Sequence, residues 1–565
     1  MKRLIGVGCA WILATSTALG TEVTFSTEDA EAAANVRLAV SGLSPDEDGW
    51  IAPPRLVRAV GDALKPFGYY AAQVSVTQEG RQQRVLVTLG RRILLSAPDI
   101  TIRGSAREDP EVKRLLDAVP PSGTPLKHRD YEDFKAALTR LTLAKGYFDA
   151  EFRRSRLEVS VKNASARWVI DWDSGERWRF GRTVFQGSQI EVARLNALQS
   201  FQSGDAFEAE KVADLSRRLS ETGWFESVAV TPRFKEAQDH ELPLLAAVAA
   251  RAKNEVELGL AVDSDVGLNG EVNWTRPWIN RRGQSLKFTG GASTKEQSLT
   301  GQWKLPQASD PLNDYWTVSA GYKHTDLNDT RSQNVTMAVA RTDVLSSGWQ
   351  RTPSVTMSHS RFTQANTDES TFLLYPGLSF SRVRQRGGLS PDWGDSQRYS
   401  VEVSRTEWGS GVDFAILRLQ DGVLRTWRGR HRFLGRLTLG WITTDDLDKV
   451  PPEKRFFAGG DKSVRGYGYQ KISPRDDEDQ LIGASKLATG SVEYQYRVTN
   501  GWWAAAFLDA GDAVRRLSEW NLKKGAGFGV RWESPVGPVK FDLAWPLGDD
   551  SESGLHFYVG LGAQW

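Results

Sequence analysis

The second half of the chain consists of short segments in which apolar and polar residues alternate. In SVEYQYRV (491–498) the valines and tyrosines share one face of an extended strand, and the serine, glutamate, glutamine and arginine share the other. VKFDLAWPL (539–547) and YWTVSAGYK (315–323) alternate in the same way. A period of two residues is that of a β-strand with one apolar face. Residues 256–565 are therefore predicted to be all β.

Tryptophan is concentrated in the same half, where 15 of the 21 tryptophans follow residue 256. Several lie near the ends of alternating segments: Trp274, Trp278, Trp349, Trp408, Trp441, Trp502 and Trp503. A soluble β-sandwich also alternates, but a membrane barrel carries aromatic girdles at both interfaces. Outside the N-terminal leader, no run of 18 apolar residues predicts a helical span. At roughly 19 residues per strand and connection, residues 256–565 would form an antiparallel transmembrane β-barrel of about 16 strands.

The N-terminus is predicted to be a secretory signal peptide covering residues 1–20. Lys2 and Arg3 precede an apolar run, and the small residues Ala18 and Gly20 lie at −3 and −1 of a cleavage site before Thr21. The single cysteine, Cys9, lies inside the apolar run. The mature chain would then contain no cysteine and no disulfide.

Residues 34–255 contain an internal repeat. Three helix-like segments end in a glycine and two aromatic residues, GYY (68–70), GYF (146–148) and GWF (223–225). The glycine is typical of a helix C-cap. Three strand-like segments end in similar turns, VRLAVSGL (36–43), ITIRGS (100–105) and TVFQGS (183–188). Three α+β units with the order β-α-α-β-β are predicted at 34–97, 98–178 and 179–255, rather than three unrelated units.

These features together resemble the superfamily of outer-membrane insertases and two-partner secretion transporters. The repeats resemble POTRA domains, and their number resembles the TamA family, the outer-membrane subunits of the translocation and assembly module. BamA relatives usually have five such repeats and two-partner transporters have two. Four stretches carry the resemblance: RGGLSPDWGDSQRYS (386–400), FFAGGDKSVRGYGYQ (456–470), GASKLATGSVEYQY (483–496) and VRWESPVGPVKFDLAWP (530–546). One departure is the C-terminus, GLGAQW, where many outer-membrane proteins end in phenylalanine.

The resemblance implies a role for the glycine-rich loop FFAGGDKSVRGYGYQ. A phosphate-binding loop is not expected, because no glycine directly precedes Lys462. In the superfamily, the VRGY loop folds into the barrel lumen and its arginine pairs with carboxylates of the wall. We name the corresponding set the lumenal lock: Arg465, Gly466, Tyr467, Glu493, Phe507, Asp509 and Gly511. One guanidinium bridging Glu493 and Asp509 would offset their repulsion. The alternative is a solvated loop arginine.

The resemblance also implies that the barrel closes between its first strand, near 257–265, and its last, 555–565. We expect a lateral gate there at Leu258, Gly560, Gly562 and Trp565, since glycine weakens a strand. The function implied is assembly and secretion of outer-membrane proteins and autotransporters. The partners implied are a TamB-type protein anchored in the inner membrane, unfolded clients, outer-membrane lipid and lipopolysaccharide. The alternatives are a two-partner-secretion-type pore and an envelope-spanning bridge for lipid transport.

No enzyme activity is predicted. The six histidines are scattered without HExxH spacing, and no G-x-S-x-G elbow is present. No metal or cofactor is therefore expected. The net charge of +2 gives no electrostatic indication of nucleic-acid binding.

Overall fold

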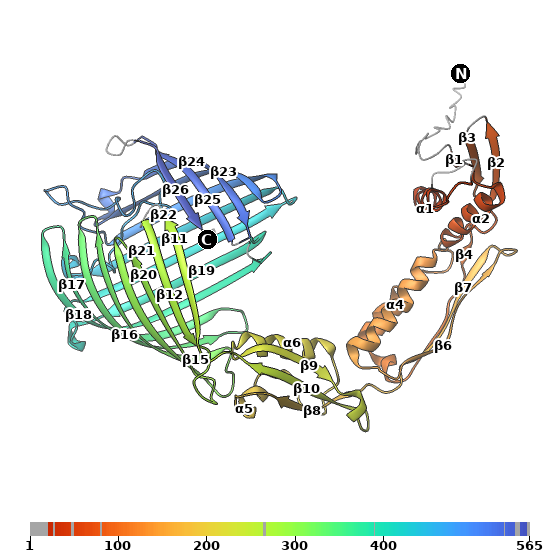
Figure 1. The fold of residues 1–565 in the computed structure, drawn as a ribbon, viewed down its shortest axis with the longest axis horizontal. Coiled ribbons are helices and arrows are strands. Elements are labelled where there is room, and N and C mark those ends of the chain that lie inside the picture. The colour runs from red at the N-terminus through yellow and green to blue at the C-terminus, as the bar shows by residue number, and fades with distance from the viewer. Residues whose placement is uncertain are drawn as a thin grey trace, which may run out of the picture. The chain divides into compact units, whose positions relative to one another are not determined.

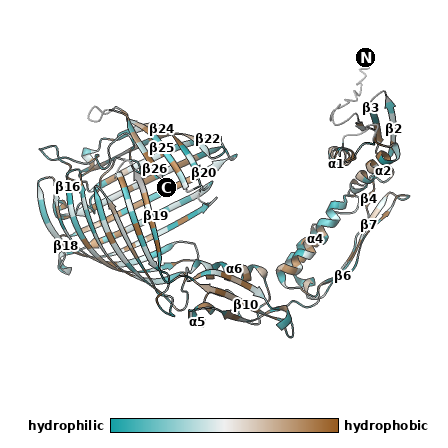
Figure 2. Cartoon of the chain, viewed as in Figure 1, coloured by the Kyte–Doolittle hydropathy of each residue, from teal (hydrophilic) through white to brown (hydrophobic). Residues whose placement is uncertain are grey.

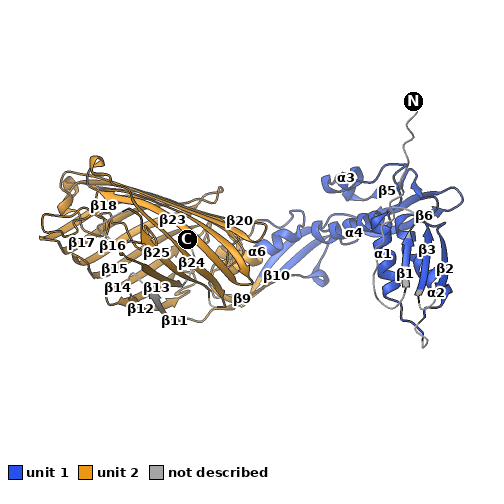
Figure 3. Cartoon of the chain, turned by 90° about the horizontal axis from the view of Figure 1, so that it is seen from above, with its two compact units in different colours: residues 1–184, 201–214, 230–245 blue, residues 185–200, 215–229, 246–565 orange. Residues whose placement is uncertain are grey.

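The computed structural model describes residues 21–25, 29–46, 50–79, 82–263, 267–388, 390–535, 537–548 and 554–561 (Figure 1). The predicted signal peptide lies outside these residues. Within the described ranges, no helix is both long enough and apolar enough to cross a membrane. The chain divides into two compact units (Figure 3). One contains residues 1–184, 201–214 and 230–245, and the other contains 185–200, 215–229 and 246–565.

The first repeat has the predicted order of elements but begins earlier than expected. Its elements are β1 (Thr21–Phe25), α1 (Ala30–Ser41), α2 (Pro53–Leu64), a 3₁₀ turn (Lys65–Phe67), β2 (Gln73–Glu79) and β3 (Gln82–Thr88). The sheet order is β1-β3-β2, with β1 parallel to β3. Because β1 precedes residue 34, the first repeat extends beyond the predicted range 34–97.

The prediction of a strand at VRLAVSGL (36–43) is wrong, because most of this segment belongs to helix α1. Asp29 caps the helix by accepting a hydrogen bond from the Ala32 backbone N–H at 3.1 Å. Ala32, Val36 and Val40 are buried at a spacing of four residues, which is the period of one helix face. The local alternation in 36–43 was therefore part of a longer helical pattern that starts in the alanine-rich stretch before it.

The second and third repeats follow the predicted order. The second contains β4 (Leu94–Leu95), β5 (Asp99–Arg103), α3 (Pro110–Asp117), α4 (His128–Lys145), β6 (Glu151–Ser160) and β7 (Ser165–Asp173). The third contains β8 (Arg179–Gln186), α5 (Val192–Asn196), α6 (Ala209–Glu221), β9 (Phe225–Pro232) and β10 (Glu241–Ala250). In the second, β7 pairs with β4, β5 and β6, and in the third the order is β8-β10-β9.

The first two glycine–aromatic motifs lie at joints between consecutive repeats. Gly146 ends α4 in the left-handed conformation, with φ 80°, which favours glycine. Two residues later, the Phe148 ring packs edge-on against Trp178, which directly precedes β8, and against Phe207 of the third repeat, at centroid distances of 5.4 and 5.1 Å. At the preceding joint, the Tyr70 hydroxyl lies 2.7 Å from His128 Nε2. Burial lowers the pKa of His128 below its usual value.

The barrel is a 16-stranded antiparallel sheet in which neighbouring strands follow chain order from β11 to β26, as predicted. The strands are β11 (Glu255–Asp263), β12 (Gly267–Arg276), β13 (Ser285–Ser293), β14 (Glu296–Pro306), β15 (Asp314–Leu327), β16 (Thr330–Val344), β17 (Gln350–Gln364), β18 (Thr367–Arg386), β19 (Trp393–Ser404), β20 (Phe414–Trp427), β21 (His431–Thr444), β22 (Lys486–Thr499), β23 (Trp502–Val514), β24 (Lys523–Ser534), β25 (Gly537–Pro546) and β26 (His556–Leu561).

Hydrophilic and hydrophobic positions are interspersed along these strands (Figure 2). Successive side chains of a strand point to opposite faces, here the lumen and the outer face. On β22, Val492 and Tyr494 are exposed on the outside, whereas Glu493 and Gln495 are buried inside. Most of the expected girdle tryptophans are at least partly exposed, but Trp503 is only 2% exposed. It lies inside, beneath the Arg432 guanidinium at 4.0 Å from the ring centroid. Including Trp503 in the girdle was therefore wrong, because it follows Trp502 directly and faces the opposite side.

The turns at one end of the barrel contact residues 185–200 and 215–229, which belong to the same compact unit. We call this end the repeat end. The Trp224 indole N–H donates to the Gly283 carbonyl at 2.9 Å. The Arg194 guanidinium donates to the Pro306 carbonyl, also at 2.9 Å. Because β11 begins at this end and strands alternate in direction, β18 and β20 finish here and β19 starts here.

Candidate functional site

The long loop between β21 and β22, residues 445–485, is anchored inside the barrel. Tyr467 is 1% exposed, and Val464 and Phe456 are also buried. These loop residues share a hydrophobic cluster with inward-facing Tyr375 of β18 and Phe414 of β20. An apolar cluster between the loop and the wall fixes the loop backbone. The loop can therefore present Arg465 in one position.

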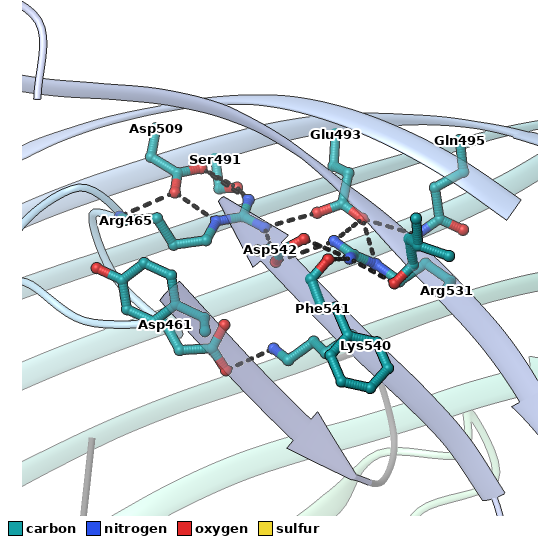
Figure 4. A network of polar contacts seen from close by, with 12 residues as sticks. Asp461, Arg465, Ser491, Glu493, Gln495, Asp509, Arg531, Lys540, Phe541 and Asp542 are labelled. Carbon is teal, nitrogen blue, oxygen red and sulfur yellow. Dashed lines mark hydrogen bonds and ion pairs between the residues drawn. The ribbon is translucent and has the colours of Figure 1, made fainter. Parts of the chain in front are cut away.

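Arg465 lies at the centre of a buried ion network (Figure 4). Its Nε and Nη2 donate to the two carboxylate oxygens of Asp509 at 2.8 and 3.0 Å. Its Nη1 donates to Glu493 at 2.9 Å and to Asp542 at 3.0 Å. The guanidinium carbon lies 3.3 Å from the centroid of the Phe507 ring. The bidentate pair and the ring fix both the position and the plane of the guanidinium.

A second arginine, Arg531 of β24, completes the network. The motifs in the sequence did not predict its participation. Its Nη2 donates to Glu493 at 2.7 Å and to Asp542 at 3.1 Å. Asp542 of β25 was also missed, and neither residue is more than 2% exposed. Both residues lie in the family-like stretch VRWESPVGPVKFDLAWP (530–546). Each occupies an inward-facing position on one of the neighbouring strands β24 and β25. Strand parity could have identified them, but only the fold places them beside Arg465.

Glycines on the adjacent strand make room for the loop. A Cβ on Gly525 of β24 would lie 1.7 Å from the Arg465 carbonyl oxygen, and one on Gly527 would lie 2.3 Å from the Phe507 ring. Gly466 has φ 95°, a conformation suited to glycine. The remaining lock residue, Gly511, lies against Ala488 and Thr489 of the neighbouring strand. It has a packing role and does not contact Arg465.

The tip of the loop is also attached to the last strand. The Tyr558 hydroxyl of β26 accepts from the Gly466 backbone N–H at 3.0 Å and donates to the Tyr467 carbonyl at 2.9 Å. Nearby, Lys540 of β25 pairs with loop Asp461 at 2.5 Å. Gly560 faces Lys540, since a Cβ there would lie 2.7 Å from the lysine Cε. The sequence did not indicate Tyr558, because its role depends on the return of β26 to the loop.

The expected lateral gate lies between the ends of the sheet. β11 and β26 come close together, yet among the described residues no ladder of hydrogen bonds pairs them. Leu258 of β11 is 77% exposed. Gly560 is buried against Lys540, and Gly562 and Trp565 lie outside the described residues. We call this junction the seam.

The network is suited to holding a loop in place. It combines three carboxylates, from Glu493, Asp509 and Asp542, with the guanidiniums of Arg465 and Arg531, all buried inside the barrel. Every carboxylate is an ion-pair partner of an arginine. Buried charges are tolerated only when paired and hydrogen-bonded. The described residues contain no cluster of metal-ligating side chains.

Comparison with known proteins identifies the family. An Omp85 superfamily domain matches residues 253–565. The outer membrane protein assembly factor BamA of Nitratidesulfovibrio vulgaris is 33% identical over 133 residues, which cover 22% of this chain and 17% of that protein. The chloroplastic outer envelope protein 80 of Arabidopsis thaliana is 30% identical over 145 residues, covering 24% of this chain and 18% of that protein. Each match spans less than a fifth of the relative's length.

A solved structure has the same fold. The crystal structure of BamA from Haemophilus ducreyi lacking POTRA domains 1–3 superposes with a TM-score of 0.68 and 15% sequence identity. The superposition covers 83% of this chain and 99% of that one. The domain match includes all sixteen barrel strands and more than half of the chain. The chain therefore belongs to the Omp85 superfamily, as an outer-membrane β-barrel with POTRA-like repeats on the periplasmic side.

Proposed function

We propose that this protein assembles or secretes outer-membrane proteins by admitting client strands at the seam. The observation that carries the proposal is the absence of a hydrogen-bonded ladder between β11 and β26 among the described residues. Unpaired strand edges are templates for an extended chain. A client hairpin would pair with an edge strand at the seam and then move sideways into the lipid, without nucleotide hydrolysis.

The repeats would deliver clients to the barrel. β2, β6 and β9 each lie at an edge of the sheet in their repeat. An edge strand can bind an extended client through main-chain hydrogen bonds, which tolerate many side-chain sequences. The contacts of Trp224 and Arg194 with the barrel turns attach part of the third repeat to the periplasmic rim. The repeats therefore provide binding edges, and the third provides a connection to the barrel.

Within the superfamily, we assign the chain to the TamA type. The repeat count of three supports this assignment, as do the motifs at 386–400, 456–470, 483–496 and 530–546. The role would be assembly of autotransporters and other outer-membrane proteins with a TamB-type partner anchored in the inner membrane. We propose neither catalysis nor a cofactor. The lumenal lock, extended to include Arg531, Asp542 and Tyr558, would hold the loop against β26 while clients bind.

A disulfide across the seam tests the proposal. Leu258→Cys would be combined with Val559→Cys or Phe557→Cys on β26, in a mature chain that has no other cysteine. The oxidised protein should stay folded but lose client assembly, and activity should return on reduction. The matched control is a cysteine pair across the closed β15–β16 ladder, at Val318 and Val339, which face each other. Full assembly activity in the oxidised seam variant would refute lateral admission and favour a transport pore.

A further inference from the structure

The outer wall of the barrel has a polar cluster near the repeat end, on β18, β19 and β20. The outward residues of β18 change from Leu378 and Phe380 to Arg382, Arg384 and Arg386 as the strand reaches this end. Register places Arg384 opposite Asp395 of β19 and Arg386 opposite Trp393. Arg425 of β20 pairs in register with Trp393 from the other side. We name the four arginines 382, 384, 386 and 425 the arginine cluster.

The charges of this cluster are unbalanced, unlike those on the neighbouring strands. Asp395 accepts a bidentate pair of hydrogen bonds from Arg384 at 3.0 and 2.9 Å, and Arg425 lies 3.9 Å from the same carboxylate. Asp421, the other nearby carboxylate, accepts from the Tyr399 hydroxyl at 2.9 Å. Within the described part of the chain, Arg382 and Arg386 have no ion-pair partner. Four guanidiniums therefore face two carboxylates.

The adjacent strands at the same rim provide an internal comparison. Arg341 of β16 makes a bidentate pair with Asp314 of β15, at 3.0 and 2.8 Å. Arg351 of β17 does the same with Asp343, at 3.1 and 3.0 Å. Each arginine there has its own carboxylate, so that section of the rim is neutral. The excess positive charge begins at β18.

A groove on the outer wall starts at the arginine cluster. It has a volume of 620 Å³ and is lined at one end by Arg384, Asp395, Gln397, Asp421 and Arg425. Its other end is lined by the outward apolar residues Val423, Leu437, Val492 and Leu508, each at least 41% exposed. Between these side chains the wall is low, because Gly435, Gly490 and Ala510 occupy the outward positions. The groove is thus cationic at the rim and apolar toward the membrane interior.

Aromatic rings flank the cationic end. The guanidiniums of Arg425 and Arg386 lie 4.6 and 5.1 Å from the Trp393 ring centroid, and that of Arg382 lies 4.6 Å from Trp349. Tryptophan and arginine together are typical of the level of lipid head groups. The repeat end is the periplasmic end, so this cluster faces the periplasmic leaflet of the membrane.

We propose that this groove binds an anionic phospholipid of the periplasmic leaflet. The phosphate would lie beside the Asp395 carboxylate and contact Arg384 and Arg425 from the solvent side, where Arg382 and Arg386 supply the excess positive charge. One acyl chain would follow the apolar groove over Gly435 and Gly490. Charge complementarity selects an anionic head group, since a zwitterionic one would leave the excess positive charge unbalanced. The site goes beyond the proposed assembly function and does not depend on it, because it lies away from the seam.

Two variants separate the polar and apolar halves of the site. Arg384→Gln with Arg425→Gln removes the head-group ligands. Gly490→Leu fills the groove and leaves every charge in place, since a Cβ there meets only the Arg436 carbonyl oxygen, at 3.9 Å. The control is Arg341→Gln with Arg351→Gln, which removes two arginines from the same face and leaves Asp314 and Asp343 without their arginine, as the first variant does for Asp395.

The test is native mass spectrometry of the full chain released from nanodiscs that contain phosphatidylglycerol and phosphatidylethanolamine. Wild type and control should retain phosphatidylglycerol preferentially. The Arg384/Arg425 variant should lose that retention by about 30-fold, at about 1 kcal/mol per arginine near the head-group level. Gly490→Leu should lose it as well, and phosphatidylethanolamine should change little.

Four outcomes would overturn the proposal. The first is equal retention of both lipids by wild type. The second is equal loss from the control and the Arg384/Arg425 variant, which would show a general rim charge effect. The third is displacement of bound phosphatidylglycerol by inorganic phosphate with no effect of Gly490→Leu, which would indicate an anion site without an acyl groove. Photo-crosslinking from Leu508 that yields client protein in place of lipid would also refute it.

Discussion

Replacing Arg465 by alanine should release the loop at 445–485 from the barrel lumen. In the variant, Glu493 still pairs with Arg531 at 2.7 Å, and Asp542 also keeps Arg531 as a partner. Asp509 keeps the Ser491 hydroxyl at 2.6 Å and the backbone N–H of residue 465 at 3.0 Å, but no other described cation lies within ion-pair distance of it. Asp509 is therefore the carboxylate that becomes uncompensated in a buried site.

Leaving one partner of a buried ion pair uncompensated costs roughly 3–5 kcal/mol. Taking about 4 kcal/mol, the ratio of docked to released loop would fall by about 1000-fold. Arg465→Lys keeps the charge but loses the bidentate geometry, so its effect should be smaller, at about 1–2 kcal/mol. Asp509→Asn should be harmful in the wild-type background. It should be beneficial in the Arg465→Ala background, where it removes the unpaired charge.

Limited trypsin digestion of the reconstituted barrel measures loop release, because Lys462 and Lys471 lie in the loop. Cleavage at these sites follows the population of the released form when docking is fast. Heat-modified gel mobility reports barrel stability in parallel, and Arg282→Ala, an exposed turn arginine, is the control. Equal cleavage in Arg465→Ala and Arg282→Ala would refute the reasoning. So would a second substitution at Asp509 that worsens the alanine variant.

Three further changes test the other contacts. Tyr558→Phe leaves the buried Gly466 N–H without its acceptor and should cost about 1–3 kcal/mol, seen as faster trypsin cleavage of the loop without loss of the barrel; cleavage at the wild-type rate would contradict a link between the loop and β26. Deleting residues 21–97 should spare barrel insertion and abolish binding of a TamB-type partner, whereas a barrel that no longer folds would refute modularity. Lowering the pH from about 7 to about 5 should loosen the joint at Tyr70. In the folded state, the pKa of His128 is below its usual value of about 6.5. As the pH falls below about 6.5, the exposed histidine of the opened joint binds a proton more readily than the buried one, so the closed joint loses stability. Spin-label distances across the joint should broaden in wild type and not in His128→Gln, and the same broadening in both would refute the role of this histidine.

Local patterns in the sequence were sufficient to predict the class of each half of the chain. Alternation with period two predicted membrane-spanning strands, because one face of each strand must meet lipid. The length of residues 256–565, at roughly 19 residues per strand and connection, predicted about 16 of them. Glycine before an aromatic pair predicted helix ends, since the left-handed conformation at Gly146 depends on the missing Cβ. The same local reasoning failed at 36–43, where a short alternating stretch lies within a helix. It also failed at Trp503, which was assigned to the girdle because it is a tryptophan, although its position in the alternation places it on the inward face.

Tertiary structure decided which of these residues meet. Arg465 comes from a loop, Glu493, Asp509, Arg531 and Asp542 come from four different strands, and Tyr558 comes from the last strand. Their contacts depend on barrel closure, strand register and the depth to which the loop enters, and none of these is a property of a short segment. The arginine cluster depends on register as well, because Arg384 and Arg425 are 41 positions apart in sequence and meet only through β19. The sequence determined which face of its strand each side chain occupies. The barrel sheet determined the neighbours of each side chain, because pairing between strands depends on residues that are far apart in the sequence.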